Sequence, residues 1–301
     1  DQYTVAVLCL IAVAARSQSA AAELLEGVKE ISRPGVPGSL ALLSETSWPV
    51  VAGRVEGYEE PVVGAARWQK GRIVAFAHGG FLGEGAFKQQ GLERLLLNSI
   101  KWATRPGQRR LLVARNKPLA DMLAGKGFSV ERIEAPTADA LSKADLLVLD
   151  THDLREQDIA PVQGFVKRGG GLIAAGLGWG WLQLNPGKTI QEHPGNRLLA
   201  QAGIMWTAAY TEGTSPGGYA AAEPPSEILA AQRALARLAK GSDSEQRQAS
   251  WTLSQAVRTA PAEDKYLLGR LDALKAGLGR PIIPSPENPL THEKPLERLL
   301  F

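Results

Sequence analysis

The stretch VQGFVKRGGGLIAAGLGWGWLQLNPGKTIQEHPGNRLLAQAGIMWT, residues Val162–Thr207, decides the fold of this chain. Its first residues repeat apolar side chains at helical spacing, and three glycines, Gly169 to Gly171, end that helix. Leu172–Ala175 then reads as a short buried strand, and a loop rich in glycine and tryptophan follows it. A helix, a tight turn and a buried strand in this order are typical of an open α/β sheet.

The residues after this strand carry the first functional information. In open α/β sheets, ligands bind outside the carboxyl ends of the strands. In class I amidotransferases and related cysteine hydrolases, such a strand end presents a nucleophilic cysteine. Here Gly176–Trp181 reads GLGWGW and contains no nucleophile. The sequence therefore predicts the architecture of a catalytic fold without its nucleophile.

Upstream of this stretch, strands and helices alternate regularly from Arg110 onward. We expect strands at 111–114, 128–133, 145–150 and 172–175, and helices at 117–126, 138–142 and 161–168. The run at 145–150 is apolar without interruption, as in strands that a parallel sheet buries on both faces. The pattern predicts an α/β fold with a flavodoxin-like or class I glutamine amidotransferase-like doubly wound sheet. One more strand is expected at Ile204–Thr207.

The segments on either side of this series differ from it. After a short helix at 23–31, β segments are expected at 40–43, 50–52, 62–68 and 73–77. The last two form an N-terminal hairpin whose turn, Gln69–Gly71, would place Gly71 at positive φ. After Pro225, three amphipathic helices are expected, the second opened by a capping box of Ser242 and Glu245. This helical appendage could stand free or pack on the sheet.

Composition sets limits on the partners. The 301 residues are 44% hydrophobic and carry a net charge of +3, and the basic residues are spread along the chain. A nucleic-acid site needs a basic face interleaved with aromatic residues, so we expect no nucleic-acid partner. The length allows one large core plus an appendage.

The apolar run VAVLCLIAVAA, Val5–Ala15, has the length of a signal-peptide core and is too short to span a bilayer. We expect a signal peptide over 1–22 whose basic start is missing, although a buried first strand is the alternative. From this signal peptide we expect secreted or periplasmic localisation and a mature form without a membrane segment. Cys9 lies inside this run, so the mature protein would hold no disulfide, thiolate metal site or cysteine nucleophile.

These signals divide the chain into four parts. They are the signal peptide (1–22), an amidotransferase-like α/β domain (23–222), a three-helix appendage (223–280) and a proline-rich linker (281–301). The apolar pattern that begins in the last residues, before Phe301, suggests that the linker leads to a missing downstream domain.

The histidines are spaced too far apart for a metal site. His78, His152, His193 and His292 form no pair at helical spacing, so we expect neither a metal nor another cofactor. His292 begins a pattern like the zinc motif HExxH, but its fifth position is Leu296.

Two groups of residues are candidates for a ligand site. His78 ends one buried strand and Asp150 with His152 ends another, where side chains face the ligand crevice. Each has an alternative role: His78 could instead be hydrogen-bonded to a nearby loop, and Asp150 could cap a following helix. Trp179 and Trp181 lie two apart, and Gln183 and Asn185 continue that row in an extended segment. Such a face suits glycan or peptide stacking, whereas the alternative is that the tryptophans fill the empty crevice.

The order of segments resembles the N-terminal region shared by the TRP-channel-associated factors of animals and the enhancin-like, mucin-degrading zinc metallopeptidases. The stretches that carry the resemblance are ARWQKGRIVAFAHGGFL (66–82), LLLNSIKWA (95–103), FVKRGGGLIAAG (165–176), WGWLQLNPG (179–187) and HPGNRLLAQAGIMWT (193–207). The resemblance implies an amidotransferase-like domain without catalytic residues of its own. The peptidase motif of that family belongs to a downstream domain, so no catalytic residue is assigned here.

Three functions remain open from the sequence. The first is a non-catalytic binding and scaffolding module of a secreted enhancin-like metallopeptidase, with a glycan or glycoprotein and the downstream peptidase domain as partners. The second is a stand-alone hydrolase-like enzyme that uses His78, Asp150 and His152. The third is a protein-interaction module like the channel-associated factors.

Overall fold

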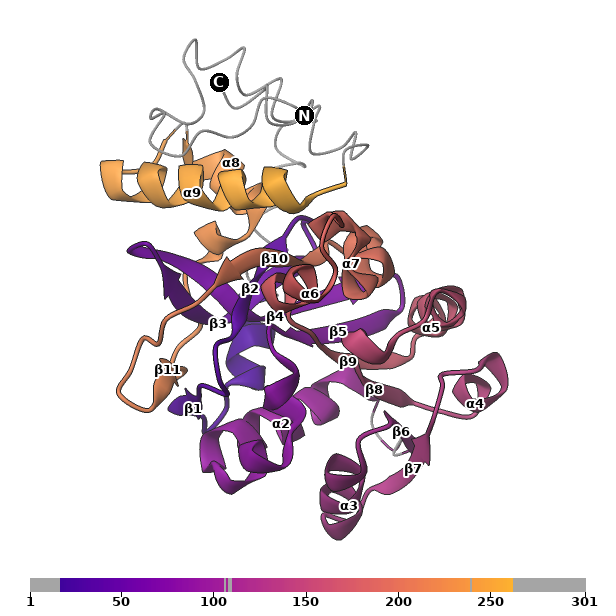
Figure 1. Cartoon of the computed structure of the whole chain (residues 1–301). Helices are drawn as coiled ribbons and strands as arrows, with labels where there is room; N and C mark the ends of the chain where they lie inside the picture. Colours follow the sequence, from indigo (N-terminus) through magenta and orange to yellow (C-terminus); the bar gives the residue numbers. More distant parts are fainter. Residues whose placement is uncertain (1–16, 106, 108–109, 239, 262–301) are drawn as a thin grey trace, which may run out of the picture.

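A seven-stranded mixed sheet forms the centre of the protein, in the strand order β3-β4-β5-β9-β8-β6-β7 (Figure 1). The computed structural model describes residues 17–105, 107, 110–238 and 240–261. The strands are β3 (Ser47–Val55), β4 (Tyr58–Trp68), β5 (Gly71–Phe76), β6 (Arg110–Ala114), β7 (Ser129–Ile133), β8 (Leu146–Asp150) and β9 (Gly171–Ala175). β3, β4 and β5 form an antiparallel meander, and β5 then continues the sheet in parallel with β9.

Helices cover both sides of this sheet. They are α2 (Gln90–Ala103), α3 (Lys117–Gly125), α4 (Ala138–Ser142), α5 (Glu156–Arg168), α6 (Gly178–Leu184), α7 (Pro194–Leu199), α8 (Ala231–Leu238) and α9 (Asp243–Thr259). α2 and α3 lie on one side, and α4 and α5 lie on the other (Figure 1). The apolar strands are buried on both faces, as their composition predicts.

The predicted α/β class is confirmed, and the sheet is mixed and mostly parallel. β7, β6, β8 and β9 lie side by side although β6 precedes β7 in the chain. This second-first-third-fourth arrangement is the strand order of flavodoxin-type sheets. The antiparallel β3-β4 hairpin extends the sheet beyond β5, so the predicted hairpin region is part of the central layer.

A separate ribbon lies across the central sheet. It pairs β2 (Gly38–Leu42) with β10 (Ile204–Tyr210), so the strand expected at 204–207 exists but lies outside the main sheet. A side chain at Gly64 of β4 would contact Leu42 of the ribbon at 2.9 Å, so this glycine lets the two layers approach. A second small ribbon pairs β1 (Glu30–Ser32) with β11 (Gly218–Ala220).

Each face of the β2–β10 ribbon is buried in a different hydrophobic cluster. Leu40, Leu42 and Trp206 face the main core. Ala41 and Met205, which alternate with them, pack against α8 and α9. This alternation follows from the period of two along a strand. The helical appendage is therefore packed on the sheet domain, not free-standing.

Several predicted details are corrected. The positive φ in the β4–β5 turn is at Gln69 (φ 52) and not at Gly71. Gly71 is required for a different reason, because a side chain there would overlap the backbone of Val166 and Gly170. The helix expected to begin at Pro161 begins at Glu156, since the Asp158 carboxylate accepts a hydrogen bond from the Arg155 backbone at 3.1 Å and fixes an earlier start.

The N-terminal helix also differs from the expectation. It covers residues 17–24 instead of 23–31, and Ala20, Ala21 and Leu24 are buried in the main core. Most of the predicted signal peptide, the third appendage helix and the proline-rich linker lie outside the described residues. Within the described part of the chain, no helix has the length and apolar character needed to cross a membrane. The capping box of Ser242 and Glu245 opens α9 as predicted.

Candidate functional site

The predicted residues meet where three parallel strands end. Phe76 of β5, Ala175 of β9 and Asp150 of β8 are in register across the sheet. His78 follows the first of these strands, and His152 follows the third. Asp150 Oδ2 lies so close to Gly79 that any side chain there would overlap it. The sheet therefore brings His78, Asp150 and His152 to one edge.

The imidazole of His78 is half-buried and held by the backbone. Its Nδ1 accepts a hydrogen bond from the Gly80 N–H at 2.8 Å and caps the short 3₁₀ turn Gly79–Leu82. Burial lowers the pKa of His78, and a nearby charge on His152 acts in the same direction, while Asp150 opposes both. This is the geometry expected for a strand-end histidine bound to its own loop.

Asp150 holds His152 by two contacts. Asp150 Oδ1 accepts a hydrogen bond from the His152 backbone N–H at 3.0 Å and lies 3.1 Å from His152 Nδ1. The aspartate also caps the 3₁₀ turn Thr151–Asp153, so its capping role is confirmed. An aspartate that binds one imidazole nitrogen orients the other toward solvent or a ligand. This pair is the one arrangement here that resembles acid–base chemistry.

A fully buried histidine lies behind this pair. The ring of His193 is 5.7 Å from that of His152 and 5.6 Å from that of Trp181, both edge-on. Neither of its nitrogens has a hydrogen-bond partner among the described residues. Burial lowers the pKa of His193 to about 3, with a smaller contribution from the charge of His152. The ring is therefore neutral at ordinary pH, and it packs against the rings of His152, Trp181 and Trp206.

Trp206 fills the space above the strand ends. It is completely buried, and its Nε1 donates a hydrogen bond to the Phe76 carbonyl at 3.0 Å. A side chain at Gly176, the position after β9, would overlap Thr151 Oγ1 and meet Trp206 at 3.2 Å. The space at the end of β9 is therefore occupied by an indole and a buried hydroxyl.

The segment with the two tryptophans is helical, so its prediction as an extended row is wrong. α6 covers Gly178–Leu184, and at about 100° per residue Trp179 shares a face with Gln183. Trp181 shares the opposite face with Asn185 by the same geometry. Gly178 allows this helix because a side chain there would overlap the Thr207 carbonyl. The four residues do not form one binding face.

Both tryptophans are half-buried, and they have different contacts. Trp179 Nε1 donates to the Val36 carbonyl at 3.2 Å, which ties α6 to the loop before β2. Trp181 packs on His193. Gln183 is exposed, while the Asn185 amide donates to the Trp181 carbonyl at 2.8 Å and ends the helix. Trp179 with Gln183 is thus the more accessible half.

The cluster offers limited chemistry. The Asp150–His152 pair can hold or move a proton, but the hydroxyl of the adjacent Thr151 is buried and has no hydrogen-bond partner among the described residues. Within the described residues, no group of three or more His, Cys, Asp or Glu side chains is placed to hold a metal ion.

Sequence reasoning missed His193 and Trp206. Both lie in HPGNRLLAQAGIMWT, but HPGN reads locally as a turn before a helix. In the structure Asn196 is buried, accepts from the Trp206 N–H at 2.6 Å and donates to its carbonyl at 2.9 Å. The sequence carries no local signal for this contact, because Asn196 and Trp206 are ten residues apart and lie on different elements.

The comparison with protein families decides the relationship. The family model TCAF_N, described as "TRPM8, N-terminal domain", matches residues 3–224. The chain belongs to this family. The predicted resemblance to channel-associated factors is thereby confirmed.

Curated members of the TCAF family are similar in sequence to part of this chain. TRPM8 channel-associated factor 2 of Bos taurus is 30% identical over 191 residues, which are 62% of this chain and 19% of that protein. TRPM8 channel-associated factor 1 of Homo sapiens is 30% identical over 188 residues, or 61% of this chain and 19% of that protein. The chain spans about a fifth of the length of these relatives.

Solved structures extend the fold to a peptidase. The IMPa metallopeptidase from Pseudomonas aeruginosa superposes with a TM-score of 0.52 at 16% identity, covering 68% of this chain and 24% of that one. IMPa in complex with T-antigen gives a TM-score of 0.51 at 17% identity, covering 91% of this chain and 33% of that one. At this identity the likeness concerns the fold.

Proposed function

We propose that this chain is a non-catalytic binding and scaffolding module of a secreted, enhancin-like metallopeptidase, and that it contacts a glycan or glycoprotein. The observation that carries the proposal is the fold shared with part of IMPa, a metallopeptidase whose solved complexes contain an O-glycopeptide and T-antigen. A peptidase domain elsewhere in the same protein would supply the chemistry, and export would bring the module to extracellular glycoproteins.

The strand-end cluster supports a role in binding over one in catalysis. Hydrolases of this architecture need an exposed nucleophile after the strand that corresponds to β9, where this chain has Gly176 beneath Trp206. The half-buried Trp179 and the exposed Gln183 remain one place where a ligand could stack and form a hydrogen bond.

The test is a titration of the full chain with an O-glycopeptide and with the same peptide lacking the glycan, followed by calorimetry. We expect the glycopeptide to bind at least ten times more tightly, with no cleavage of either peptide by mass spectrometry. Equal affinity for the two peptides, or no binding of either, would refute the proposal.

Enzymatic activity is the second candidate, favoured by the Asp150–His152 contact and by the closeness of Asp150 to the His78 loop. The same assay tests it. Cleavage of the glycopeptide that is lost in Asp150→Asn and retained in Gln183→Ala would establish this candidate instead.

The third candidate, a protein-interaction module, is favoured by the curated relatives, whose names describe them as channel-associated factors. Binding of the unglycosylated peptide or of a folded protein partner, without any preference for the glycan, would support it.

A further inference from the structure

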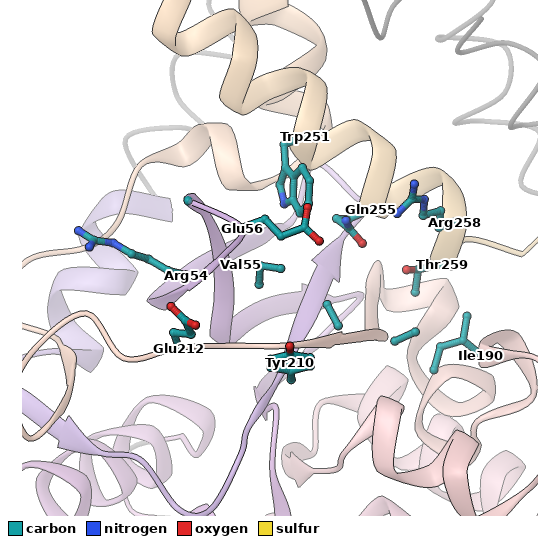
Figure 2. A pocket seen from close by; sticks show the side chains of 13 residues that line it. Arg54, Val55, Glu56, Ile190, Tyr210, Glu212, Trp251, Gln255, Arg258 and Thr259 are labelled. Carbon is teal, nitrogen blue, oxygen red and sulfur yellow. The ribbon is translucent and has the colours of Figure 1, made fainter. Parts of the chain in front are cut away.

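A groove lies between α9, the end of β10 and the tip of the β3–β4 hairpin (Figure 2). Its volume is about 420 Å³, within the range of small-ligand sites. The helix contributes Trp251, Gln255 and Arg258, and the segment at the end of β10 contributes Tyr210 and Glu212. Three segments distant in sequence thus meet around one hollow.

Two aromatic side chains line the groove in different ways. The side chain of Tyr210 is 60% exposed. Trp251 is half-buried, stacks on Tyr58 with ring centroids 4.6 Å apart and an interplanar angle of 6°, and donates from Nε1 to Glu60 Oε1 at 2.7 Å. The indole is therefore fixed in place, while the tyrosine ring is open to a ligand.

A chain of buried hydrogen bonds holds this wall of the groove. Glu60 accepts from Ser39 Oγ as well as from Trp251, and Ser39 Oγ lies 2.6 Å from Thr207 Oγ1. Thr207 Oγ1 in turn accepts from the Ala209 N–H at 3.1 Å. The chain links α9 through β4 and β2 to β10, so the two aromatic walls keep a fixed spacing. A preformed spacing lowers the cost of ordering a ligand.

The charges around the groove balance. The lining holds two arginines, Arg54 and Arg258, and two glutamates, Glu56 and Glu212, and α9 adds the Gln255 amide (Figure 2). A lining with two cations, two carboxylates and an amide offers many hydrogen bonds and no net field. Such a lining favours a neutral ligand with many hydroxyl groups over a sulfated or sialylated one. A sugar ring has this chemistry, and its C–H face packs on an aromatic ring.

We propose that this groove binds a neutral saccharide unit of an O-linked glycan, with its ring against Tyr210 and its hydroxyls bonded to Gln255 and the flanking charged groups. The inference rests on the proposed glycan-binding function and adds the location and the charge class of the ligand. It places the sugar in the groove and not at Trp179 on α6.

The experiment compares full-chain variants in calorimetric titrations. The probes are an O-glycopeptide carrying a neutral disaccharide, its sialylated form and the bare peptide. Tyr210→Ala and Gln255→Ala remove groove contacts, while Leu184→Ala, at a side chain 78% exposed on α6, is the matched surface control. Trp179→Ala tests the alternative location. Urea midpoints within error of wild type show that each variant folds.

We expect Tyr210→Ala and Gln255→Ala each to weaken neutral glycopeptide binding at least tenfold. Leu184→Ala should leave it unchanged, and the sialylated form should bind more weakly. A tenfold loss in Trp179→Ala with none in the groove variants would place the sugar on α6 and overturn the groove proposal. If the wild type binds the glycopeptide and both groove variants keep its affinity, the groove proposal is overturned while the proposed function stands. Equal weakening of the bare peptide would assign the groove to a peptide and overturn the saccharide.

Failure of the wild type to bind any glycopeptide would overturn the proposed function. The groove is then tested separately by titrating N-acetylgalactosamine to millimolar concentration while following ligand resonances by saturation-transfer NMR. A transfer signal that is lost in Tyr210→Ala supports a saccharide groove. Its absence in the wild type overturns the groove.

Discussion

Replacing Glu60 by glutamine should change how the stability of the protein depends on pH. This carboxyl is 3% exposed, and burial raises its pKa from the ordinary 4.5 to about 7, against the opposing hydrogen bonds from Ser39 and Trp251. Between pH 4.5 and 7 the folded state therefore binds more protons than the unfolded state. Its contribution to the free energy of unfolding is fully present below pH 4.5 and is lost as pH rises through about 7.

The magnitude follows from the two pKa values. At about 1.4 kcal/mol per pKa unit, the interval from 4.5 to about 7 corresponds to about 3 kcal/mol. His193 acts in the opposite sense, because its pKa is lowered from 6.5 to about 3 and its contribution is lost as pH falls below 6.5. The wild-type profile mixes both slopes, so the informative quantity is the difference between wild type and Glu60→Gln.

The assay is urea unfolding of the full chain at intervals from pH 4.5 to 8. The difference in unfolding free energy, wild type minus Glu60→Gln, should fall by about 3 kcal/mol across this range and level off above pH 7. Glu131→Gln, an exposed carboxylate on β7, is the control and should give a flat difference. A flat difference for Glu60→Gln as well would refute the raised pKa and the account of the buried hydrogen-bond chain.

Three further outcomes test the packing. Trp206→Ala should cost about 3 to 5 kcal/mol in urea unfolding, as for other buried large-to-small changes, and a cost below about 1 kcal/mol would contradict its role as the filling of the strand-end space. Gly176→Ala should destabilise through overlap with Thr151, whereas Gly85→Ala, with open space around it, should not; equal melting temperatures would contradict the close packing. EDTA should leave the melting temperature unchanged, because the described residues present no metal-binding cluster, and a fall of several degrees would reveal a metal.

The sequence predicted those parts of the fold that local periodicity determines. The buried run before Asp150 and the capped α9 show their periods directly, and the structure places them at the expected positions. The pairing of Leu40 with Trp206 joins segments 166 residues apart, and no local pattern specifies such a partner. Because this pairing is non-local, the sequence predicted the strand β10 but not its partner β2.

Only part of the candidate site could be predicted from the sequence. His78 and Asp150 come at strand ends, so the parallel sheet alone brings them together. The helix at Trp179 was missed because glycine disfavours helices. Gly178 is present because a side chain there would overlap the Thr207 carbonyl, a contact between distant segments that no local pattern shows. The groove lined by Tyr210 and α9 depends on how the appendage packs, which amphipathicity alone does not determine.

The ribbon of β2 and β10 has a consequence for dissecting the protein. The family match ends at residue 224, close to the change in composition, and a truncation there would look natural. It would remove α8 and α9 and leave Ala41, Leu43 and Met205 as a bare apolar strip on an exposed two-stranded ribbon. Such a strip invites self-association. An evolutionary boundary and a solubility boundary thus fall at different places in this chain, and fragments intended for expression should extend beyond α9.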